Sequence, residues 1–270
     1  MPRCARSLLF VPGHRPDRFD KAVASGAHQV VLDLEDAVAP EAKAAARDAV
    51  AGWLARGAPA LVRINAADTG WYESDLAMLQ AFPDAGVMLP KAERHSLAHT
   101  AAALSGRPVV ALLETVAGYL DLPGLCGVRG LSRIAFGSVD FGLESGIADE
   151  GEAMTPVRIQ VVLQSKLAGL QAPVDGVSVN FSDAARMGLD ALRSRQLGFG
   201  GKLCIHPAQV RAVNEAFEPS AQERDWAARV LAAFEASAGA ATALDGKMID
   251  RPVVERARQI MGQAAAQAHA

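Results

Sequence analysis

Two carboxylates in this chain stand at the ends of short apolar runs. Glu114 follows the run Val109–Leu113, and Asp140 closes the segment Ile134–Asp140, 26 positions further along. Each run is short enough for a buried strand, and parallel α/β barrels place catalytic and metal-binding acids just past the carboxyl ends of their strands. Two oxygen ligands from separate strands suit a hard cation such as Mg²⁺, which completes its shell with water and substrate. The alternative is that each acid only caps a helix or pairs with a surface base.

Polar residues follow the other apolar runs as well. They are acids, bases and amides rather than a hydrophobic plug, so a purely structural barrel end does not account for them. Buried charges are costly unless they are paired or bound to metal, and such a cluster indicates a metal, an anionic ligand, or both. In chain order these residues are His14, Arg15, Asp33, Glu35, Asp36, Arg63, Asn65, Lys91, Ser178, Asn180 and His206.

These side chains need a scaffold of alternating strands and helices. Eight candidate strands are present, at Ser7–Val11, Gln29–Leu34, Ala60–Asn65, Gly86–Pro90, Val109–Thr115, Arg133–Val139, Asp175–Asn180 and Lys202–His206. Helical patterns between and after them include Pro16–Ser25, Glu41–Arg56, Ser74–Ala81, Pro156–Leu170, Ala184–Leu197 and Pro207–Phe217. Eight such repeats predict an α/β fold, the (β/α)8 TIM barrel. A doubly wound sheet is the rival fold, but no G-x-G-x-x-G motif follows Val11.

The texture of the chain changes after Phe217. Ser220–Ala238 and Arg251–Gln267 have helical patterns, and between them Gly239–Lys247 is rich in small residues. This tail has no place in the eightfold repeat. We therefore expect a barrel domain over residues 1–218 and a C-terminal helical extension over residues 219–270, which either packs around the barrel or acts as a lid over a site.

Composition limits the class of protein. Of the 270 residues, 50% are hydrophobic and 21% are charged, which is ample for a large core, and a net charge of -3 leaves no basic footprint for nucleic acid. The three cysteines, Cys4, Cys126 and Cys204, form neither a zinc pattern nor a disulfide framework. The N-terminal apolar run is too short for a signal peptide, and no run approaches a membrane span. We expect a soluble, cytoplasmic protein without membrane or nucleic-acid partners.

Eight short motifs stand in order along the chain. They are Ser7–Arg15 (SLLFVPGHR), Leu32–Val38 (LDLEDAV), Val62–Asn65 (VRIN), Leu89–Glu93 (LPKAE), Leu113–Thr115 (LET), Phe136–Phe141 (FGSVDF), Lys202–Pro207 (KLCIHP) and Asp245–Pro252 (DGKMIDRP). Together they resemble the HpcH/HpaI aldolase/citrate lyase superfamily, which includes the citrate lyase β-subunit and the stand-alone malyl-CoA and citramalyl-CoA lyases. The resemblance runs from Ser7 to about Ile260.

The resemblance implies an enzyme, a Mg²⁺-dependent carbon–carbon lyase with Mn²⁺ as the alternative metal. It would cleave or form a 3-hydroxyacyl thioester such as malyl-CoA, citramalyl-CoA or a citryl thioester, giving an acetyl thioester and a 2-oxo acid. Carried over by position, Glu114 and Asp140 hold the metal, and Arg63 binds substrate oxygen at the reacting centre. Asp250 matches the acid/base aspartate of a lid that often covers a neighbouring subunit's site, so a homo-oligomer, either a trimer or a hexamer, is expected.

Further residues receive roles from the same resemblance. Glu35 and Asp36 would lie near the metal's waters and the substrate. Arg15 and His206 fall in segments that line the CoA side of the mouth, and Lys21 is a further candidate for the CoA phosphates. An acyl-carrier protein is the alternative to CoA as the carrier.

Other functions are compatible with the residues. A metal-dependent aldolase could release pyruvate from free 4-hydroxy-2-oxo acids, although the acidic lid motif at Asp250 argues against it. The chain could also be a carrier-dependent citrate lyase β-subunit, or could add a hydrolytic step as a thioesterase. A barrel kept only as a scaffold would be expected to lose Glu114, Asp140 or Arg63, and all three are present.

Each assignment also has a structural alternative. Arg63 could be a core arginine paired with Glu35. Asp250 precedes Arg251-Pro252, a good context for a helix N-cap, and His206 precedes a helix that starts with Pro207.

Overall fold

The computed structural model describes residues 5–237 and 239–265. Cys4, Ala238 and Gln267, which belong to expectations drawn from the sequence, lie outside the described residues. The chain divides into two units, Met1–Phe217 and Glu218–Ala270, and each is described by itself. Within the described residues, no helix combines the length and apolarity that crossing a membrane requires.

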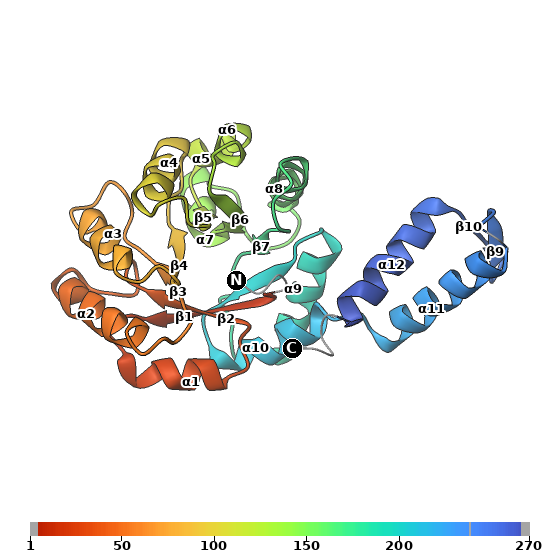
Figure 1. Cartoon of the computed structure of the whole chain (residues 1–270), viewed down its shortest axis with the longest axis horizontal. Helices are drawn as coiled ribbons and strands as arrows, with labels where there is room; N and C mark the ends of the chain where they lie inside the picture. The colour runs from red at the N-terminus through yellow and green to blue at the C-terminus, as the bar shows by residue number, and fades with distance from the viewer. Residues whose placement is uncertain (1–4, 238, 266–270) are drawn as a thin grey trace. The chain divides into compact units, whose positions relative to one another are not determined.

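The first unit is a closed barrel of eight parallel strands in sequential order, with helices around it (Figure 1). Strand β1 closes the ring by pairing with both β2 and β8, with Leu8 opposite Gln29 on one side and Leu203 on the other. The predicted (β/α)8 barrel is therefore confirmed. The strands are β1 (Ser7–Pro12), β2 (Gln29–Asp33), β3 (Leu61–Arg63), β4 (Gly86–Leu89), β5 (Val109–Leu113), β6 (Leu131–Phe136), β7 (Val174–Asp175) and β8 (Gly201–Cys204).

The helices that surround the barrel follow the strands in turn. Several begin at side chains suited to capping: Thr115, Asp183 and His206 accept backbone N–H bonds at the starts of α5, α9 and α10. The helices of this unit are η1 (Pro16–Arg18), α1 (Phe19–Ala24), η2 (Pro40–Ala42), α2 (Lys43–Leu54), α3 (Tyr72–Gln80), α4 (Arg94–Ala103), α5 (Val116–Leu120), α6 (Leu122–Cys126), α7 (Ser138–Ser145), α8 (Thr155–Leu167), α9 (Ala184–Gln196) and α10 (Pro207–Ala216).

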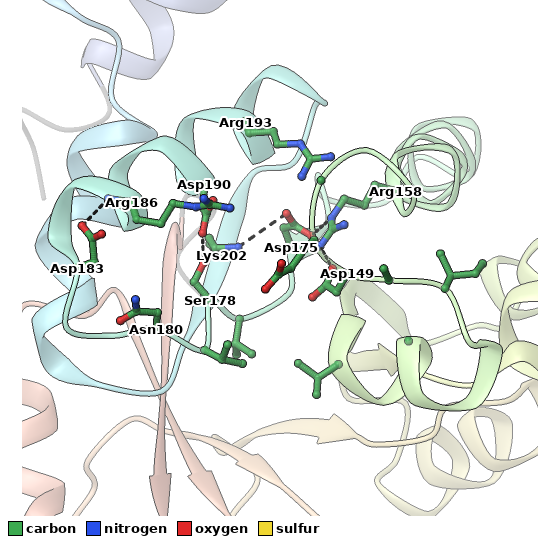
Figure 2. A pocket seen from close by; sticks show the side chains of 18 of the residues that line it. Asp149, Arg158, Asp175, Ser178, Asn180, Asp183, Arg186, Asp190, Arg193 and Lys202 are labelled. Atoms are coloured by element: carbon green, nitrogen blue, oxygen red, sulfur yellow. Dashed lines mark hydrogen bonds and ion pairs between the residues drawn. The ribbon is translucent and has the colours of Figure 1, made fainter.

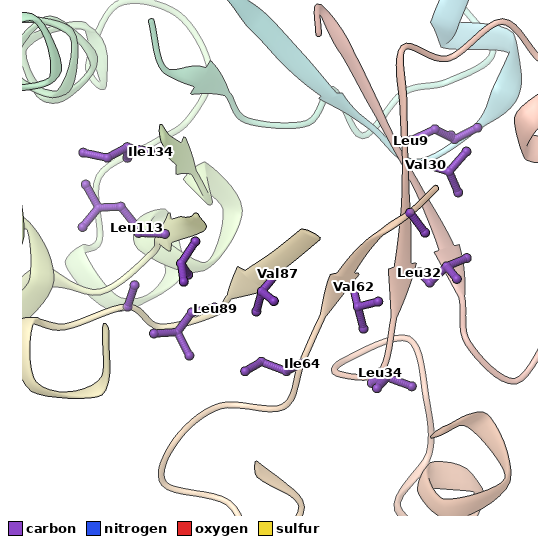
Figure 3. Packing of buried hydrophobic residues seen from close by; sticks show 14 of the residues in the cluster. Leu9, Val30, Leu32, Leu34, Val62, Ile64, Val87, Leu89, Leu113 and Ile134 are labelled. Carbon is purple, nitrogen blue, oxygen red and sulfur yellow. The ribbon is translucent and has the colours of Figure 1, made fainter. Parts of the chain in front are cut away.

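The strands separate two buried apolar layers. The larger layer lies between strands and helices and includes the side chains of Leu9, Val62 and Leu89 (Figure 3). The smaller layer fills the barrel interior, with Leu61 and Leu112 among its members. Because successive strand residues point to opposite faces, a residue two positions after an interior residue also faces the interior.

This alternation selects the polar residues that reach the barrel mouth. Val31 and Leu61 belong to the interior layer, and Asp33 and Arg63 follow them by two positions. Glu114 follows the interior residue Leu112 in the same way, one residue beyond the end of β5. The strand pattern therefore delivers two acids and one arginine to the same end of the interior.

One predicted strand is wrong in its placement. Asp175–Asn180 was expected to be the seventh strand, but β7 ends at Asp175 and the following residues form a loop. Side chains occupy the backbone groups of Gly176, since Asp175 accepts its N–H at 2.8 Å and Lys202 Nζ donates to its carbonyl oxygen at 2.6 Å. These two bonds replace the ladder bonds that would have extended the strand.

The second unit is a helical hairpin with a small β-hairpin inserted. It consists of α11 (Ala221–Ala236), β9 (Thr242–Leu244), β10 (Lys247–Ile249) and α12 (Arg251–Ala265), with an apolar core of its own that includes Val230, Ile249 and Ala257. Strands β9 and β10 are antiparallel, and Asp245 and Gly246 between them both have positive φ, at 50° and 74°. An Asp-Gly pair suits such a two-residue turn, so the sequence contained a hairpin signal where only a small-residue stretch was expected.

Candidate active site at the barrel mouth

A cavity of about 460 Å³ occupies the mouth formed by the carboxyl ends of the strands. Its polar lining comes from β2, β3, β5 and the first turn of α7, and includes Asp33, Asp36, Arg63, Glu114 and Asp140. These five residues, which the sequence placed at the ends of predicted strands, therefore meet in one concave site. Apolar side chains from β1, β5 and β8, from α7 and from the loop after β7 complete its wall.

Arg63 is held in a fixed orientation by two acids. Its Nε and Nη2 atoms donate to the two carboxylate oxygens of Asp33, both at 2.7 Å, and Nη1 lies 2.9 Å from Glu35 Oε2. Burial disfavours the charged guanidinium, but the neighbouring carboxylates outweigh that effect and raise the pKa of Arg63. The pairing of Arg63 with Glu35, which was the structural alternative to a functional role, is present, and the guanidinium nevertheless lines the cavity.

Glu114 is a buried acid with one satisfied oxygen. Its side-chain Oε1 accepts the backbone N–H of Lys91 at 2.7 Å, whereas Oε2 is buried without a hydrogen-bond partner. Burial, together with the negative charge of Glu35, raises the pKa of Glu114 to about 8, although the Lys91 N–H and Arg63 act in the opposite direction. A carboxylate oxygen left in this state is suited to a cation.

The backbone leaves no room beside Glu114. A Cβ atom at Gly137 would lie 2.7 Å from both the Cβ and the Oε2 of Glu114. Only glycine therefore allows the end of β6 to pass this close to the acid, and the sequence places it directly before α7.

Asp140 is half-buried in the first turn of α7 and lines the same cavity as Glu114. Its charge is one of those that raise the pKa of Glu114. In the part of the chain that the structure describes, no set of three or more His, Cys, Asp or Glu side chains is arranged to hold a metal ion. Two carboxylates, one with an unpartnered oxygen, nevertheless fit Mg²⁺, which needs only one or two protein ligands and takes water and substrate for the rest.

Glu35 and Asp36 differ in their surroundings. Glu35 is buried between two bases, because Lys91 Nζ donates to Oε1 at 3.1 Å and Arg63 contacts Oε2. Burial raises the pKa of Glu35, against the effect of Arg63. Asp36 is exposed, and its Oδ2 lies 3.8 Å from Arg63 Nη1. Asp36 is therefore free to contact a ligand, whereas Glu35 is already engaged.

Two residues at this site were not assigned roles from the sequence. Asp33 fixes Arg63, and the alternation of Leu32-Asp33-Leu34 is the signal that places it on the interior face. Lys91 connects Glu114 and Glu35 through its backbone N–H and its ammonium group, respectively. Its φ of 45° is in the left-handed region, which costs a non-glycine residue about 1–3 kcal/mol and is often found at functional sites.

A buried lysine side chain holds the loop after β2 in place. Lys43 Nζ donates to the carbonyl oxygens of Leu34 and Glu35, both at 2.8 Å, and to Asn65 Oδ1 at 2.7 Å. Asn65 in turn donates to Asp75 through both its backbone and its side-chain nitrogen. This network fixes the backbone that carries Glu35 and Asp36.

Arg15, Lys21 and His206 are not among the residues that line the cavity. Arg15 makes a two-pronged pair with Asp17, at 2.9 Å and 2.8 Å, and Lys21 is exposed on α1. His206 caps α10 by accepting the Ala208 N–H at 3.1 Å, as its structural alternative predicted, and its exposed ring stacks on Phe181 at a centroid distance of 4.7 Å.

Asp250 lies in the second unit, where it precedes α12. Its Oδ1 accepts the Val253 N–H at 3.3 Å, and its carbonyl oxygen accepts the Val254 N–H at 3.0 Å. These contacts are those of a helix N-cap. The side chain is half-buried within its own unit, and its role toward the barrel site stays a prediction.

Comparisons with known proteins find similar sequences over almost the whole chain. A family model described as HpcH/HpaI aldolase/citrate lyase matches residues 6–207. The chain is 36% identical to a citrate lyase subunit beta-like protein of Deinococcus radiodurans, over 98% of this chain and 99% of the relative. It is 33% identical to a (3S)-malyl-CoA thioesterase of Cereibacter sphaeroides, over 97% of this chain and 95% of the relative.

Solved structures give the same result. The protein CitE from Mycobacterium tuberculosis, in complex with magnesium, acetoacetate and coenzyme A, matches with a TM-score of 0.86 at 33% identity. The match covers 97% of this chain and 99% of that protein.

Proposed function

The chain belongs to the HpcH/HpaI aldolase/citrate lyase family, and from that premise we propose that it is a Mg²⁺-dependent carbon–carbon lyase acting on a 3-hydroxyacyl thioester. The products are an acetyl thioester and a 2-oxo acid. The proposal is supported by relatives described as citrate lyase subunit beta-like proteins and by the CitE structure with magnesium, acetoacetate and coenzyme A.

One observation in this chain carries the proposal. The buried Glu114 keeps an unpartnered carboxylate oxygen in a cavity that it shares with Asp140 and Arg63. Glu114 and Asp140 are the residues that would hold Mg²⁺. When bound, the ion supplies Lewis-acid polarisation and orientation of the oxo-acid half of the substrate.

The reaction in the cleavage direction requires a balanced transfer of one proton. The 3-hydroxyl group loses its proton, the bond between carbons 2 and 3 breaks, and its electron pair passes into a thioester enolate. Carbon 3 becomes the carbonyl carbon of the 2-oxo acid, and carbon 2 gains a proton to give the acetyl thioester. The protein must therefore stabilise an oxyanion and deliver a proton to carbon.

Arg63 is suited to stabilise the developing oxyanion. Its guanidinium is fixed by Asp33 before substrate arrives, so little reorganisation is needed when charge develops. Loss of one such donor typically costs about 10²–10³ in rate. Asp36, exposed beside Arg63, is assigned to contact with substrate or bound water, and Glu35 helps to hold Arg63 and Lys91.

Asp250 is assigned as the acid/base that moves the proton at carbon 2, a role worth roughly 10²–10⁴ in rate. This assignment makes residues 219–270 a lid and leads us to propose a homo-oligomer in which the lid of one subunit serves a neighbour. On the carrier side, Arg15, Lys21 and His206 are assigned to CoA. An acyl-carrier protein is the competing carrier.

Hydrolysis of the thioester is a second candidate function, because one relative is described as a (3S)-malyl-CoA thioesterase at 33% identity over 97% of this chain. Hydrolysis would release the thiol and a free hydroxy acid without breaking a carbon–carbon bond. The two functions therefore differ in whether a 2-oxo acid forms.

The deciding experiment measures free thiol and 2-oxo acid from malyl-, citramalyl- and citryl-CoA, with and without Mg²⁺. Equal amounts of thioester consumed and 2-oxo acid formed, only with Mg²⁺, are expected. Thiol release without a 2-oxo acid would identify a thioesterase and contradict the lyase proposal.

A further inference from the structure

Two buried carboxylate oxygens among the described residues lack a hydrogen bond, Glu35 Oε2 and Glu114 Oε2. One residue holds the other oxygen of both acids. The backbone N–H of Lys91 donates to Glu114 Oε1 at 2.7 Å, and its Nζ donates to Glu35 Oε1 at 3.1 Å. On the premise of the proposed function, we infer that Lys91 is a positioning residue, which holds each acid by one oxygen and keeps Glu35 from binding the free N–H donors of Arg63.

Another buried acid shows how a carboxylate is satisfied elsewhere in this barrel. Asp175 lies beside Arg158 in a cavity of about 710 Å³ (Figure 2). Its Oδ1 accepts from Arg158 Nε at 2.9 Å, and its Oδ2 accepts from the hydroxyl group of Ser194. A buried polar atom without a partner costs about 1–3 kcal/mol, so the two unbonded oxygens at the barrel mouth are an exception that stability does not explain.

The contact between Glu35 and Arg63 is an ion pair without a hydrogen bond. Glu35 Oε2 lies 2.9 Å from Arg63 Nη1, but the N–H bonds of Nη1 are not aligned with that oxygen. Asp33 accepts from the other two nitrogens, Nε and Nη2. Within the described part of the chain, Nη1 therefore keeps its donors unbonded, and the guanidinium that carries them lines the cavity. These are the donors that a developing oxyanion would use.

The ammonium group of Lys91 is what holds the Glu35 carboxylate in this unbonded position. It supplies the one hydrogen bond that the carboxylate receives from the described residues. Glu35 is 4% exposed, which leaves little access for water as a replacement. A carboxylate beside a guanidinium with unused donors gains a charge-assisted hydrogen bond by turning toward it. Without Lys91, we expect Glu35 to bind Nη1 and to occupy the donors meant for the substrate.

Charge supports the same role. Four side chains form a row in which the sign alternates, namely Asp33, Arg63, Glu35 and Lys91. Removal of the last member would leave one guanidinium to neutralise two buried carboxylates, and its attraction for a third negative oxygen would fall. Lys91 is 44% exposed in its side chain and is not among the residues that line the cavity. It therefore acts through its neighbours and does not touch the substrate.

The backbone of Lys91 provides the second hold. Its left-handed conformation, with φ at 45°, brings the N–H to Glu114 Oε1 and leaves Oε2 for the metal. Replacement of the side chain keeps this N–H in place. The hold on Glu35 can therefore be removed while the hold on Glu114 remains.

Lys91→Met removes the ammonium group and keeps the length of the side chain. For a thioester that the full chain cleaves with Mg²⁺, we expect kcat to fall about 10- to 10²-fold and KM to stay within about threefold. Mg²⁺ should bind at least as tightly as to the wild type in calorimetry, because the N–H on Glu114 is retained. Lys166→Met, at an exposed position of α8, is the control and should leave kcat within about twofold. Wild-type kcat in Lys91→Met, or weaker Mg²⁺ binding, would overturn the inference.

A double-mutant cycle separates this role from a general loss of structure. Since Lys91 acts through Glu35, Lys91→Met should change kcat by less than about twofold in a Glu35→Met background. That double variant leaves no buried charge unpaired, because Asp33 still neutralises Arg63, so we expect it to fold. A loss of tenfold or more in that background, about the same as in the wild type, would overturn the inference.

Crystal structures of the wild type and of Lys91→Met, both without substrate, test the inference independently of activity. In the variant, the Glu35 carboxylate should form a hydrogen bond with Arg63 Nη1, and in the wild type it should not. A Glu35 carboxylate that keeps its position in the variant would overturn the inference and leave the lyase function standing. If the wild type cleaves no thioester, the proposed function fails, and the position of this carboxylate still decides the role of Lys91.

Discussion

Arg63 and Asp33 form a buried two-pronged ion pair on neighbouring strands, with Nε and Nη2 each 2.7 Å from a carboxylate oxygen. The pair turns the third nitrogen, Nη1, toward Glu35 and Asp36. Because both donor–acceptor contacts are satisfied on one edge, the guanidinium has one orientation before any ligand enters. The strand register, with Asp33 opposite Arg63, sets this geometry.

Replacing Asp33 should therefore reduce activity by releasing Arg63. For Asp33→Asn we expect kcat to fall about 10²-fold with a smaller change in KM. The reason is that a mobile guanidinium loses more of its stabilisation of the transition state than of its binding to the substrate. Stability should fall by about 1.5–3 kcal/mol, the range for a hydrogen bond to a charged group, because the buried guanidinium loses its two-pronged partner and keeps its contact with Glu35. Steady-state kinetics and urea unfolding measure the two effects.

Asp36→Asn is the matched control. Its carboxylate is exposed and 3.8 Å from Arg63 Nη1, so its removal should change stability by less than about 1 kcal/mol. Equal losses of stability in the two variants would show that Asp33 has no special hold on Arg63.

Glu114→Gln should abolish stabilisation by Mg²⁺. A ligand that binds only the folded state raises the melting temperature as its concentration passes the dissociation constant, and we expect this rise in the wild type. Glutamine removes the charge that holds the ion but is nearly the same size. Without metal the variant should be at least as stable as the wild type at neutral pH, because the raised pKa of the buried Glu114 costs the folded wild type stability above the pKa of an exposed glutamate, and glutamine removes that cost. Differential scanning fluorimetry with a Mg²⁺ titration tests both points, and a wild-type-like Mg²⁺ response in the variant would remove Glu114 from the proposed metal site.

Gly137→Ala should displace Glu114 without changing any charge. The new methyl group would lie 2.7 Å from Glu114 Cβ and Oε2, so one of the two segments must move. We expect at least about tenfold weaker Mg²⁺ binding, measured by calorimetry. Gly188 in α9 is the control, because a Cβ there meets nothing within 4 Å, and Gly188→Ala should stabilise the protein by about 0.5–1 kcal/mol. Unchanged Mg²⁺ binding in Gly137→Ala would show that metal binding does not depend on the present position of Glu114.

The order and number of the barrel strands could be predicted because each strand is an apolar run followed by a helical pattern. Interior and exterior positions were also predictable in principle, since Leu61 and Arg63, or Leu112 and Glu114, are separated by two. The candidate site was indicated by the polar residues at the strand ends together with the motifs. Asp33 was recognised as a strand-end acid but not as the partner of Arg63, because partners across strands depend on register, which no single strand encodes.

Two other features could not be obtained from local pattern. The segment Asp175–Asn180 alternates like a strand, but Asp175 accepts the N–H of Gly176, and Lys202, from the neighbouring strand β8, donates to its carbonyl oxygen. Lys91 has an ordinary sequence context, yet its left-handed backbone brings its N–H to Glu114. Both depend on side chains distant in sequence, so propensity alone does not reveal them.

The described cysteines should react slowly at neutral pH. Burial raises the pKa of Cys126 to about 11 and that of Cys204 to about 12, although Lys202 acts against the shift at Cys204. Raising a thiol pKa lowers the fraction of reactive thiolate, to about 10⁻³ for Cys126 at pH 8. Alkylation of Cys126, followed by peptide mass spectrometry, should accelerate about tenfold per pH unit between pH 7 and 9.5, whereas the same peptide in unfolded protein should level off near pH 9. A native rate that levels off at the same pH would contradict the assigned pKa.

Asp250 can be tested so that capping and catalysis give different results. Asparagine caps a helix about as well as aspartate, whereas alanine costs about 1 kcal/mol. If Asp250 only caps α12 through Val253, Asp250→Asn should retain stability and activity together, and Asp250→Ala should lose a little of both.

If Asp250 moves the proton at carbon 2, Asp250→Asn should keep the melting temperature of the wild type and lose about 10²–10⁴ in kcat, because an amide cannot exchange that proton. Binding of Mg²⁺ and of a 2-oxo acid should remain unchanged in this variant, since neither requires proton transfer. Full turnover by Asp250→Asn would leave the residue as a helix cap, and the acid/base role would have to be assigned to another residue.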